Sequence, residues 1–183
     1  AAEVMDTHAA SLMLLDSSRQ ELIFKVALGC KANQLKETFR VKVGEGIAGT
    51  VAQTGEALIV NDTQKDERFA KRFDSSTGFQ TQAILCVPMH AKGTIIGILE
   101  AINPKNRKEF TQEDLTLFQI FADQAAIAVE NARLHAETVQ QEKTKQELKI
   151  AHDIQQNFLP DLTENKFCFD IAAKNIPALQ VGG

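Results

Sequence analysis

The stretch Thr94-Ile95-Ile96-Gly97-Ile98-Leu99-Glu100-Ala101-Ile102-Asn103 places a carboxylate where the surrounding pattern predicts an apolar core residue. Glu100 falls in phase with Ile96, Ile98 and Ile102, and alternate residues of a β-strand face the same side of the sheet. An ionised carboxylate is costly to bury unless it is paired or hydrogen-bonded. This stretch therefore predicts a strand whose buried face carries one acid with a special environment.

Polar residues upstream suggest what that environment is. Asp74, Thr77-Gly78-Phe79 and Thr81 form a polar cluster in a loop-like stretch. A buried acid with hydroxyls and a second acid nearby is typical of a polar small-molecule pocket. Two alternatives stay open: Glu100 pairs with an arginine such as Arg68 or Arg72, or it lies exposed on one face of the sheet.

The composition is that of a globular intracellular domain with room for an extension. Of the 183 residues, 44% are hydrophobic and 24% are charged. The net charge of −4 argues against nucleic-acid or membrane-surface partners, and no apolar run approaches the ~20 residues of a membrane span. Cys30, Cys86 and Cys168 are far apart, which predicts free thiols in a reducing compartment. We expect a cytoplasmic protein.

Glycine and proline divide the chain into two kinds of structure. Nine of the fourteen such residues lie between Gly29 and Gly97, whereas none lies between Pro104 and Pro160. A compact α+β domain is therefore predicted first, followed by one long helix. The boundaries that we assign are residues 1–110 for the domain, 111–159 for the helix and 160–183 for the start of a further domain.

Alternating apolar residues and turn signals predict six short strands in the first part. They span residues 11–15, 22–28, 39–43, 57–60, 83–89 and 94–103. Because most of them are joined as hairpins, we expect one antiparallel sheet with helices on its faces. A short helix is predicted after the glycines of residues 44–49, ending at Gly55.

Two kinds of chemistry find no support in the sequence. Gly44-Glu45-Gly46-Ile47-Ala48-Gly49 matches G-x-G-x-x-G, but that fingerprint binds dinucleotides only within a βαβ unit. Here the next strand belongs to a meander, so the glycines are interpreted as a tight turn with a close backbone approach. The four histidines show no zinc-ligand spacing with cysteine, and no nucleophile–base pair stands out. We predict no metal site and no catalytic residue in this chain.

Several sequence elements, taken together and in order, resemble a GAF domain over roughly residues 1–135. They are Gly44–Gly49, Asn61-Asp62, Asp66-Glu67-Arg68-Phe69, Thr77-Gly78-Phe79-Gln80-Thr81, Ile84-Leu85-Cys86-Val87-Pro88 and Gly97-Ile98-Leu99-Glu100-Ala101-Ile102-Asn103. The resemblance implies a six-stranded antiparallel sheet with flanking helices. It also implies that Ala1 to His8 supplies the last turns of a truncated first helix.

Among these elements, those in the middle of the domain are most similar to GAF domains of cyclic-nucleotide phosphodiesterases and cyclases. This similarity implies a small-molecule effector, with a cyclic nucleotide as the candidate. The residues that would approach the ligand are Ser11, Ile47, Ala48, Ala70, Asp74, Thr77, Thr81 and Glu100. A guanine edge offers two adjacent N–H donors to one carboxylate, so contact with Glu100 would favour cyclic GMP over cyclic AMP.

A second signature of that subfamily, Asn-Lys followed by Phe and then Asp-Glu, is present only in part. Asn103, Phe110 and Asp114 match it, whereas Pro104 replaces the lysine and Leu115 the glutamate.

The long helix carries an apolar repeat. Thr111 is a suitable cap, and Glu113 and Asp114 fall in the first turn, where acids favour the helix dipole. A spacing of three and four residues, typical of a heptad seam, joins Leu115, Phe118, Ala122, Ala125, Val129, Ala132, Ala136 and Val139. We predict a parallel homodimer through this seam. The alternative is that its first half packs on the domain's own sheet and the polar middle of the helix is solvated.

The end of the chain resembles the start of a different domain. Residues 147–160 are similar to the linker that enters SpoIIE/RsbU-type metal-dependent serine phosphatases, and residues 167–183 to that domain's first strand and loop. In this family the metal-binding aspartate follows paired glycines, so manganese or magnesium is expected only beyond Gly183. The resemblance implies a parent phosphatase acting on a phosphorylated anti-anti-sigma-like protein. The alternative is a ligand-free GAF dimerisation module of another signalling enzyme, such as a cyclase or a histidine kinase.

Overall fold

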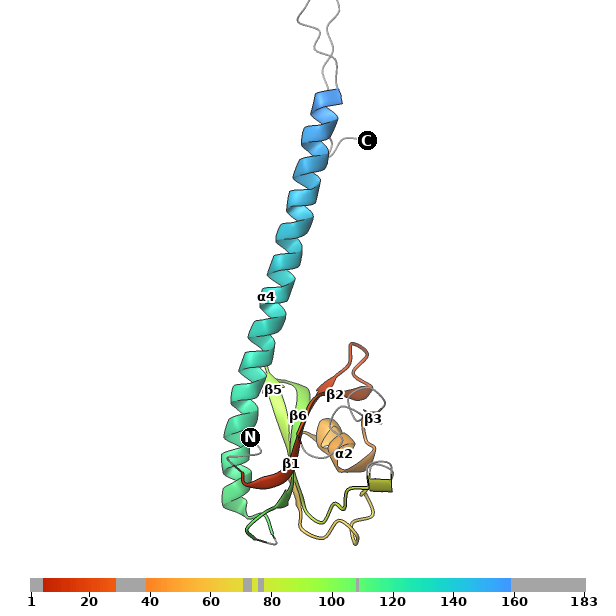
Figure 1. Cartoon of the computed structure of the whole chain (residues 1–183), viewed down its shortest axis with the longest axis vertical. Helices are drawn as coiled ribbons and strands as arrows, with labels where there is room; N and C mark the ends of the chain where they lie inside the picture. Colours follow the sequence, from red (N-terminus) through yellow and green to blue (C-terminus); the bar gives the residue numbers. More distant parts are fainter. Residues whose placement is uncertain (1–4, 29–38, 71–73, 76–77, 108, 159–183) are drawn as a thin grey trace, which may run out of the picture. The chain divides into compact units, whose positions relative to one another are not determined.

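The computed structural model describes residues 5–28, 39–70, 74–75, 78–107 and 109–158. The chain divides into two units, residues 1–130 and 131–183. The first unit holds the strands β1 (Thr7–Leu15), β2 (Glu21–Leu28), β3 (Arg40–Lys42), β4 (Leu58–Val60), β5 (Ile84–Ala91) and β6 (Thr94–Pro104) and the short helix α2 (Gly46–Thr54). The long helix α4 (Gln112–Phe158) begins in the first unit and continues into the second (Figure 1).

The six strands form one antiparallel sheet in the order β3-β2-β1-β6-β5-β4. The predicted α+β fold is therefore confirmed. The hairpins follow the turn signals of the sequence: Asp16 accepts the backbone N–H groups of Gln20 and Glu21 between β1 and β2. At the other hairpin, Lys92 and Gly93 both adopt positive φ between β5 and β6.

The expectation of a helix at residues 1–8 is wrong where the structure describes it. Thr7 and His8 belong to β1, and Thr7 pairs with Pro104 of β6. Residues 1–4 lie outside the described part of the chain. The physical reason is the length of β6: with eleven residues it offers backbone groups beyond Ala101, and an extended β1 pairs with them.

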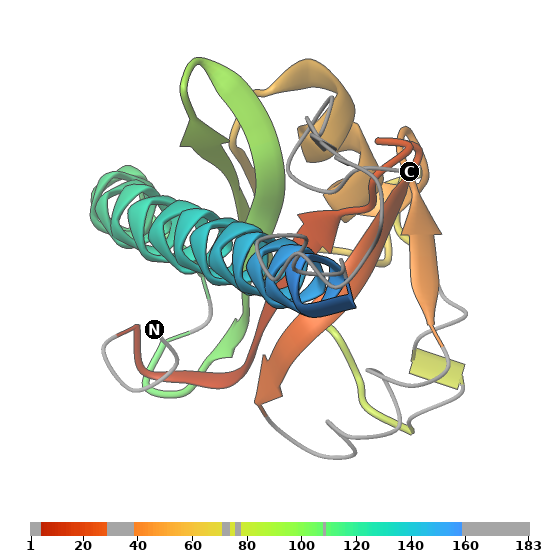
Figure 2. The same cartoon turned by 90° about the horizontal axis from the view of Figure 1, so that it is seen from above.

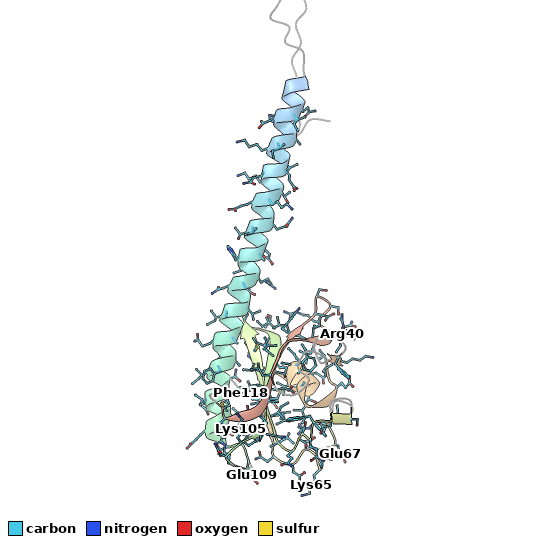
Figure 3. The ribbon with its side chains drawn as sticks, in the orientation of Figure 1. Arg40, Lys65, Glu67, Lys105, Glu109 and Phe118 are labelled. Atoms are coloured by element: carbon cyan, nitrogen blue, oxygen red, sulfur yellow. The ribbon has the colours of Figure 1, made fainter. Side chains whose placement is uncertain are left out.

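Both faces of the sheet are covered, α2 lying on one face and the first turns of α4 on the other (Figures 1 and 2). Under α2 the core contains Met13, Leu22, Val51, Cys86 and Ile98. Under α4 it contains Leu85, Met89, Leu99, Phe118 and Ala122, and Figure 3 shows Phe118 where the helix meets the sheet. Since β5 is buried on both faces, its near-continuous apolar run is explained.

The N-terminus of α4 is fixed by a reciprocal cap. Asp114 Oδ2 accepts both the backbone N–H and the hydroxyl of Thr111, at 2.7 and 2.8 Å, while the N–H of Asp114 points back to the Thr111 hydroxyl at 3.3 Å. Hydrogen bonds of this kind satisfy donors that a helix start leaves unpaired. The predicted helix start is confirmed.

The predicted heptad seam divides into a covered and an exposed half. Phe118 and Ala122 are fully buried against the sheet, and Leu115, Ala125 and Val129 are packed beside them. By contrast, Ala132, Ala136 and Val139 are exposed. The first half of the seam thus serves the domain's own core, as in the alternative left open by the sequence, and dimerisation through it stays a prediction.

Candidate functional site

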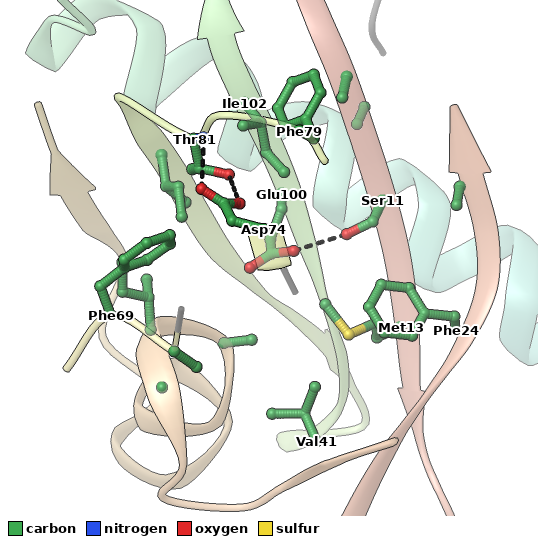
Figure 4. Close-up of a pocket in the computed structure, with 18 of the residues that line it drawn as sticks. Ser11, Met13, Phe24, Val41, Phe69, Asp74, Phe79, Thr81, Glu100 and Ile102 are labelled. Atoms are coloured by element: carbon green, nitrogen blue, oxygen red, sulfur yellow. Dashed lines mark hydrogen bonds between the residues drawn. The ribbon is translucent and has the colours of Figure 1, made fainter. Parts of the chain in front are cut away.

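A cavity of about 110 Å³ lies between α2 and the sheet (Figure 4). β1, β2 and β6 form its floor, and the segment that leads into β5 borders it. Seven of the eight predicted ligand-binding residues line it: Ser11, Ile47, Ala48, Ala70, Asp74, Thr81 and Glu100. The eighth, Thr77, lies outside the described residues. The fold therefore gathers side chains that are as far as 89 positions apart in the sequence.

Glu100 is the buried acid that the sequence indicated. Its residue is 8% exposed, and the Ser11 hydroxyl donates a hydrogen bond to Oε2 at 2.7 Å. The two residues are direct partners in the β1–β6 register, so the pairing is built into the sheet. Burial raises the pKa of Glu100 to about 6, against the lowering effect of the Ser11 hydrogen bond. This carboxyl group thus titrates near pH 6.

Of the alternative environments for Glu100, neither is found among the described residues. The side chain is not exposed, and Arg68 pairs with Asp66, with two side-chain hydrogen bonds of 2.9 and 2.6 Å. Arg72 lies outside the described part of the chain. Ser11 is the hydrogen-bond partner that the structure describes, so the second carboxylate oxygen, Oε1, is available to a ligand.

Cys86 is the cross-strand neighbour of Glu100 on β5. Burial, with the nearby Glu100 charge adding to it, raises the pKa of this thiol well above its usual range. The thiol therefore stays protonated and forms an apolar side of the acid's environment. It is free, as predicted, while Cys30 and Cys168 lie outside the described residues.

Asp74 organises the rim of the cavity. One of its oxygens accepts the Thr81 N–H at 2.8 Å, and the other accepts the Thr81 hydroxyl at 2.6 Å. Thr81 is itself buried, and its carbonyl accepts a hydrogen bond from Thr63. Asp74 thus fixes the segment that leads into β5, and it presents a second acid to the cavity (Figure 4).

The glycine turn before α2 brings the start of this helix to the cavity. Gly44 and Gly46 have φ of 86° and 68°, a region that favours glycine. At Gly49 a side chain is excluded, because a Cβ atom would lie 2.3 Å from the Lys42 carbonyl oxygen. The interpretation as a tight turn with a close approach is confirmed. Since the first N–H groups of a helix lack intrahelical partners, this turn can receive an anionic group.

The sequence reasoning missed the aromatic residues of the site, and also Glu45, an acid that lines the cavity just before α2. Phe24, Phe69 and Phe79 line the cavity, and no lysine or arginine does so within the described ranges. Phe69 and Phe79 stand in two of the family-like stretches, next to the polar residues that were singled out. A cavity with carboxylates and aromatic rings suits a planar ligand with N–H donors.

The residues that match the second signature have structural roles. Asn103, with φ of 53°, accepts the N–H groups of Gln82 and Ala83 and donates to the Gln80 carbonyl. It thereby holds the segment on which Thr81 lies. Asp114 caps α4 and forms an ion pair with Arg107 at 2.5 Å. These contacts give Asn103 and Asp114 structural roles that do not require a bound ligand.

Neither a metal-ligand cluster nor a membrane-spanning helix is found among the described residues. Within residues 5–28, 39–70, 74–75, 78–107 and 109–158, no three His, Cys, Asp or Glu side chains are grouped as metal ligands would be. No helix in the same ranges combines the length and apolar character needed to cross a bilayer.

The comparisons with known proteins agree with this architecture. The GAF domain family matches residues 1–129, and the chain belongs to that family. It is 33% identical over 162 residues to the probable 3',5'-cyclic phosphodiesterase pde-5 of Caenorhabditis elegans, covering 84% of this chain and 22% of that protein. It is 34% identical over 140 residues to the dual 3',5'-cyclic-AMP and -GMP phosphodiesterase 11 of Drosophila melanogaster, covering 73% of this chain and 9% of that protein. The chain thus spans less than a quarter of these relatives.

Among solved structures, the fold is similar to the GAF domain of a phosphoenolpyruvate-protein phosphotransferase from Coxiella burnetii. The TM-score is 0.66 at 22% identity, over 74% of this chain and 79% of that one. Free methionine-R-sulfoxide reductase from Neisseria meningitidis, in complex with its substrate, gives a TM-score of 0.61 at 19% identity, over 73% and 74% of the two chains. The GAF fold thus occurs in proteins of different function, and only the site distinguishes among ligands.

Proposed function

We propose that this GAF domain is a regulatory module that binds a cyclic nucleotide in the α2 cavity, with cyclic GMP preferred over cyclic AMP. The observation that carries the proposal is Glu100: a buried carboxylate at the cavity, held by Ser11 through one oxygen and open through the other. The relatives named as cyclic phosphodiesterases support the ligand class.

The chemistry of the cavity matches the parts of such a ligand. An ionised Glu100 can accept the two adjacent N–H donors of guanine, which the corresponding edge of adenine does not present. Phe69 and Phe79 supply apolar contacts to a planar base, and the first turn of α2 supplies N–H groups to a phosphate. Typical ligand pockets measure roughly 300–1,000 Å³. The cavity of about 110 Å³ must therefore widen when a whole nucleotide enters.

Calorimetric titration of the chain with cyclic GMP and with cyclic AMP at pH 7.5 tests the proposal. We expect cyclic GMP to bind roughly five- to a hundred-fold more tightly, because adenine leaves the buried carboxylate without its donors. Glu100→Gln should remove that preference, while Glu56→Gln, an exposed acid outside the cavity, should leave it unchanged. Titrations that are silent for both nucleotides at millimolar concentration contradict the proposal.

We further infer that the domain regulates a SpoIIE/RsbU-like serine/threonine phosphatase through a dimeric helix. Support comes from the linker-like sequence of residues 147–160, whose last two residues lie outside the described part. The substrate class would be a phosphorylated anti-anti-sigma-like protein. The purified chain should show no phosphatase activity with manganese or magnesium, since the expected ligands follow Gly183. Metal-dependent turnover by this chain contradicts that assignment and leaves the alternative of another signalling enzyme.

A further inference from the structure

Glu45 brings a carboxylate to the end of the cavity at which α2 begins. It precedes the helix as its N-cap residue, it is half-buried, and it lines the cavity with Ile47 and Ala48 of the first helical turn. The proposed nucleotide uses the N–H groups of that turn for its phosphate. An acid therefore lies beside the position at which the negative charge of the ligand is expected.

The Glu45 side chain does not cap the helix that it precedes. No side-chain capping hydrogen bond joins it to α2, and its Oε2 instead accepts the N–H of Lys42 at the end of β3, at 3.3 Å. A capping side chain would satisfy donors of the first turn. Glu45 thus leaves those donors to a ligand, while its own charge stays near them.

The described lining of the cavity is negative as a whole. Glu45, Asp74 and Glu100 line it, and no lysine or arginine does so in the part of the chain that the structure describes. Thr81 holds Asp74 and Ser11 holds Glu100, so both of these acids are fixed at the cavity (Figure 4). Among the described residues the N-terminus of α2 is the source of positive potential, and a helix start is equivalent to about half a positive charge.

This small positive potential suits one negative charge better than two. A cyclic phosphate is a diester with a single negative charge, whereas an open phosphate monoester carries about −1.5 to −2 at pH 7. The additional charge of a monoester would face Glu45 between a helix and a sheet, where repulsion is stronger than in bulk water.

We propose that Glu45 is a specificity-determining residue of the cavity, which favours nucleotides with a monoanionic cyclic phosphate and disfavours those with an open, dianionic phosphate. The inference rests on the proposed binding of cyclic GMP and says which form of phosphate the site accepts.

Three ligands with the same base and different charge measure this effect. Guanosine has no phosphate, cyclic GMP carries one negative charge, and guanosine 5'-monophosphate carries about two. Because all three present the same guanine edge, the contact with Glu100 is common to them and cancels in the ratios of their dissociation constants. In calorimetric titration at pH 7.5, wild type should bind cyclic GMP most tightly and the 5'-monophosphate about tenfold or more less tightly than cyclic GMP.

Substitutions at Glu45 separate its charge from its place in the turn. Glu45→Gln removes the charge and keeps an oxygen that can accept the Lys42 N–H. We expect it to tighten binding of the 5'-monophosphate by about tenfold, that of cyclic GMP by less, and that of guanosine not at all. Glu45→Asp keeps the charge and should keep the wild-type ratio. Glu56→Gln, which removes an exposed acid outside the cavity, is the control for net charge, and thermal unfolding checks that each variant is folded.

The outcomes separate the role of Glu45 from the existence of the site. A 5'-monophosphate that binds wild type as tightly as cyclic GMP, or a ratio that Glu45→Gln leaves unchanged, overturns the role of Glu45 while the proposed nucleotide site survives. Equal changes for all three ligands, or a Glu45→Asp protein that behaves like Glu45→Gln, also overturn it, because neither follows the charge. Titrations that are silent for all three ligands contradict the proposed function and this inference with it.

Discussion

Glu100→Gln should stabilise the domain at neutral pH even though it weakens ligand binding. In the folded chain the pKa of Glu100 is raised to about 6 from an ordinary value of 4.5 by burial. Below pH 4.5 the carboxyl group is protonated in both the folded and the unfolded chain, so its burial adds no pH-dependent cost to folding. As the pH rises from about 4.5 towards 6, the unfolded chain loses this proton before the folded chain does, so the folded state loses stability over that range. The amide is neutral at every pH and avoids this loss.

The magnitude follows from the size of the shift. A difference of 1.5 units between 6 and 4.5 corresponds to about 2 kcal/mol at 1.4 kcal/mol per unit. For a domain of this size that is a change in Tm of roughly 5–10 °C. Ser11 can donate to the amide oxygen of glutamine as it does to the carboxylate, so its hydroxyl keeps a partner.

Scanning calorimetry of both proteins between pH 4 and pH 8, at one protein concentration, measures this effect. The informative quantity is the difference in stability between the two proteins, because every ionisable group other than residue 100 is common to both and its contribution cancels. We expect the difference to be small at pH 4 and to grow in favour of the glutamine variant up to about pH 7. A pH-independent difference, or a less stable Glu100→Gln protein at pH 7, would refute the reasoning. In parallel, cyclic GMP should bind wild type more tightly as the pH rises through 6.

Three other substitutions test how the site is held. Asn103→Ala removes the partners of three backbone groups and should cost about 1–3 kcal/mol in chemical denaturation, against little change for the exposed Asn131→Ala. Gly49→Ala should lower the free energy of unfolding by about 1–3 kcal/mol, although alanine has the better helix propensity, because the new Cβ meets the Lys42 carbonyl oxygen. The exposed Gln53→Ala is its control. A Gly49→Ala protein of unchanged stability would argue against the close approach. Phe118→Ala should cost about 3–5 kcal/mol, with exposed Thr116→Ala as its control, and a loss below 1 kcal/mol would mean that α4 does not close the core.

The sequence by itself determined the strands, the turns and the long helix. Periods of two and of three to four residues report directly which face of an element is buried, and glycine and proline mark where elements end. It also singled out Glu100, since one acid in phase with Ile98 and Ile102 is a local exception to a local pattern. Seven of the eight proposed ligand residues line one cavity, and four of them, Ile47, Ala48, Thr81 and Glu100, stand in the family-like stretches.

Only the tertiary structure determined which elements pair or pack against one another, because a local sequence pattern carries no information about distant partners. Pairing with β6 extended β1 over Thr7 and His8, because the partner strand had backbone groups left to satisfy. The helix sequence carries apolar residues on more than one side, and only packing showed that Phe118 and Ala122 cover the sheet while Ile127 remains exposed. The meeting of Ser11 with Glu100 likewise depends on the register of two strands that are distant in sequence. A periodic sequence shows that a face is buried, and the fold determines against what.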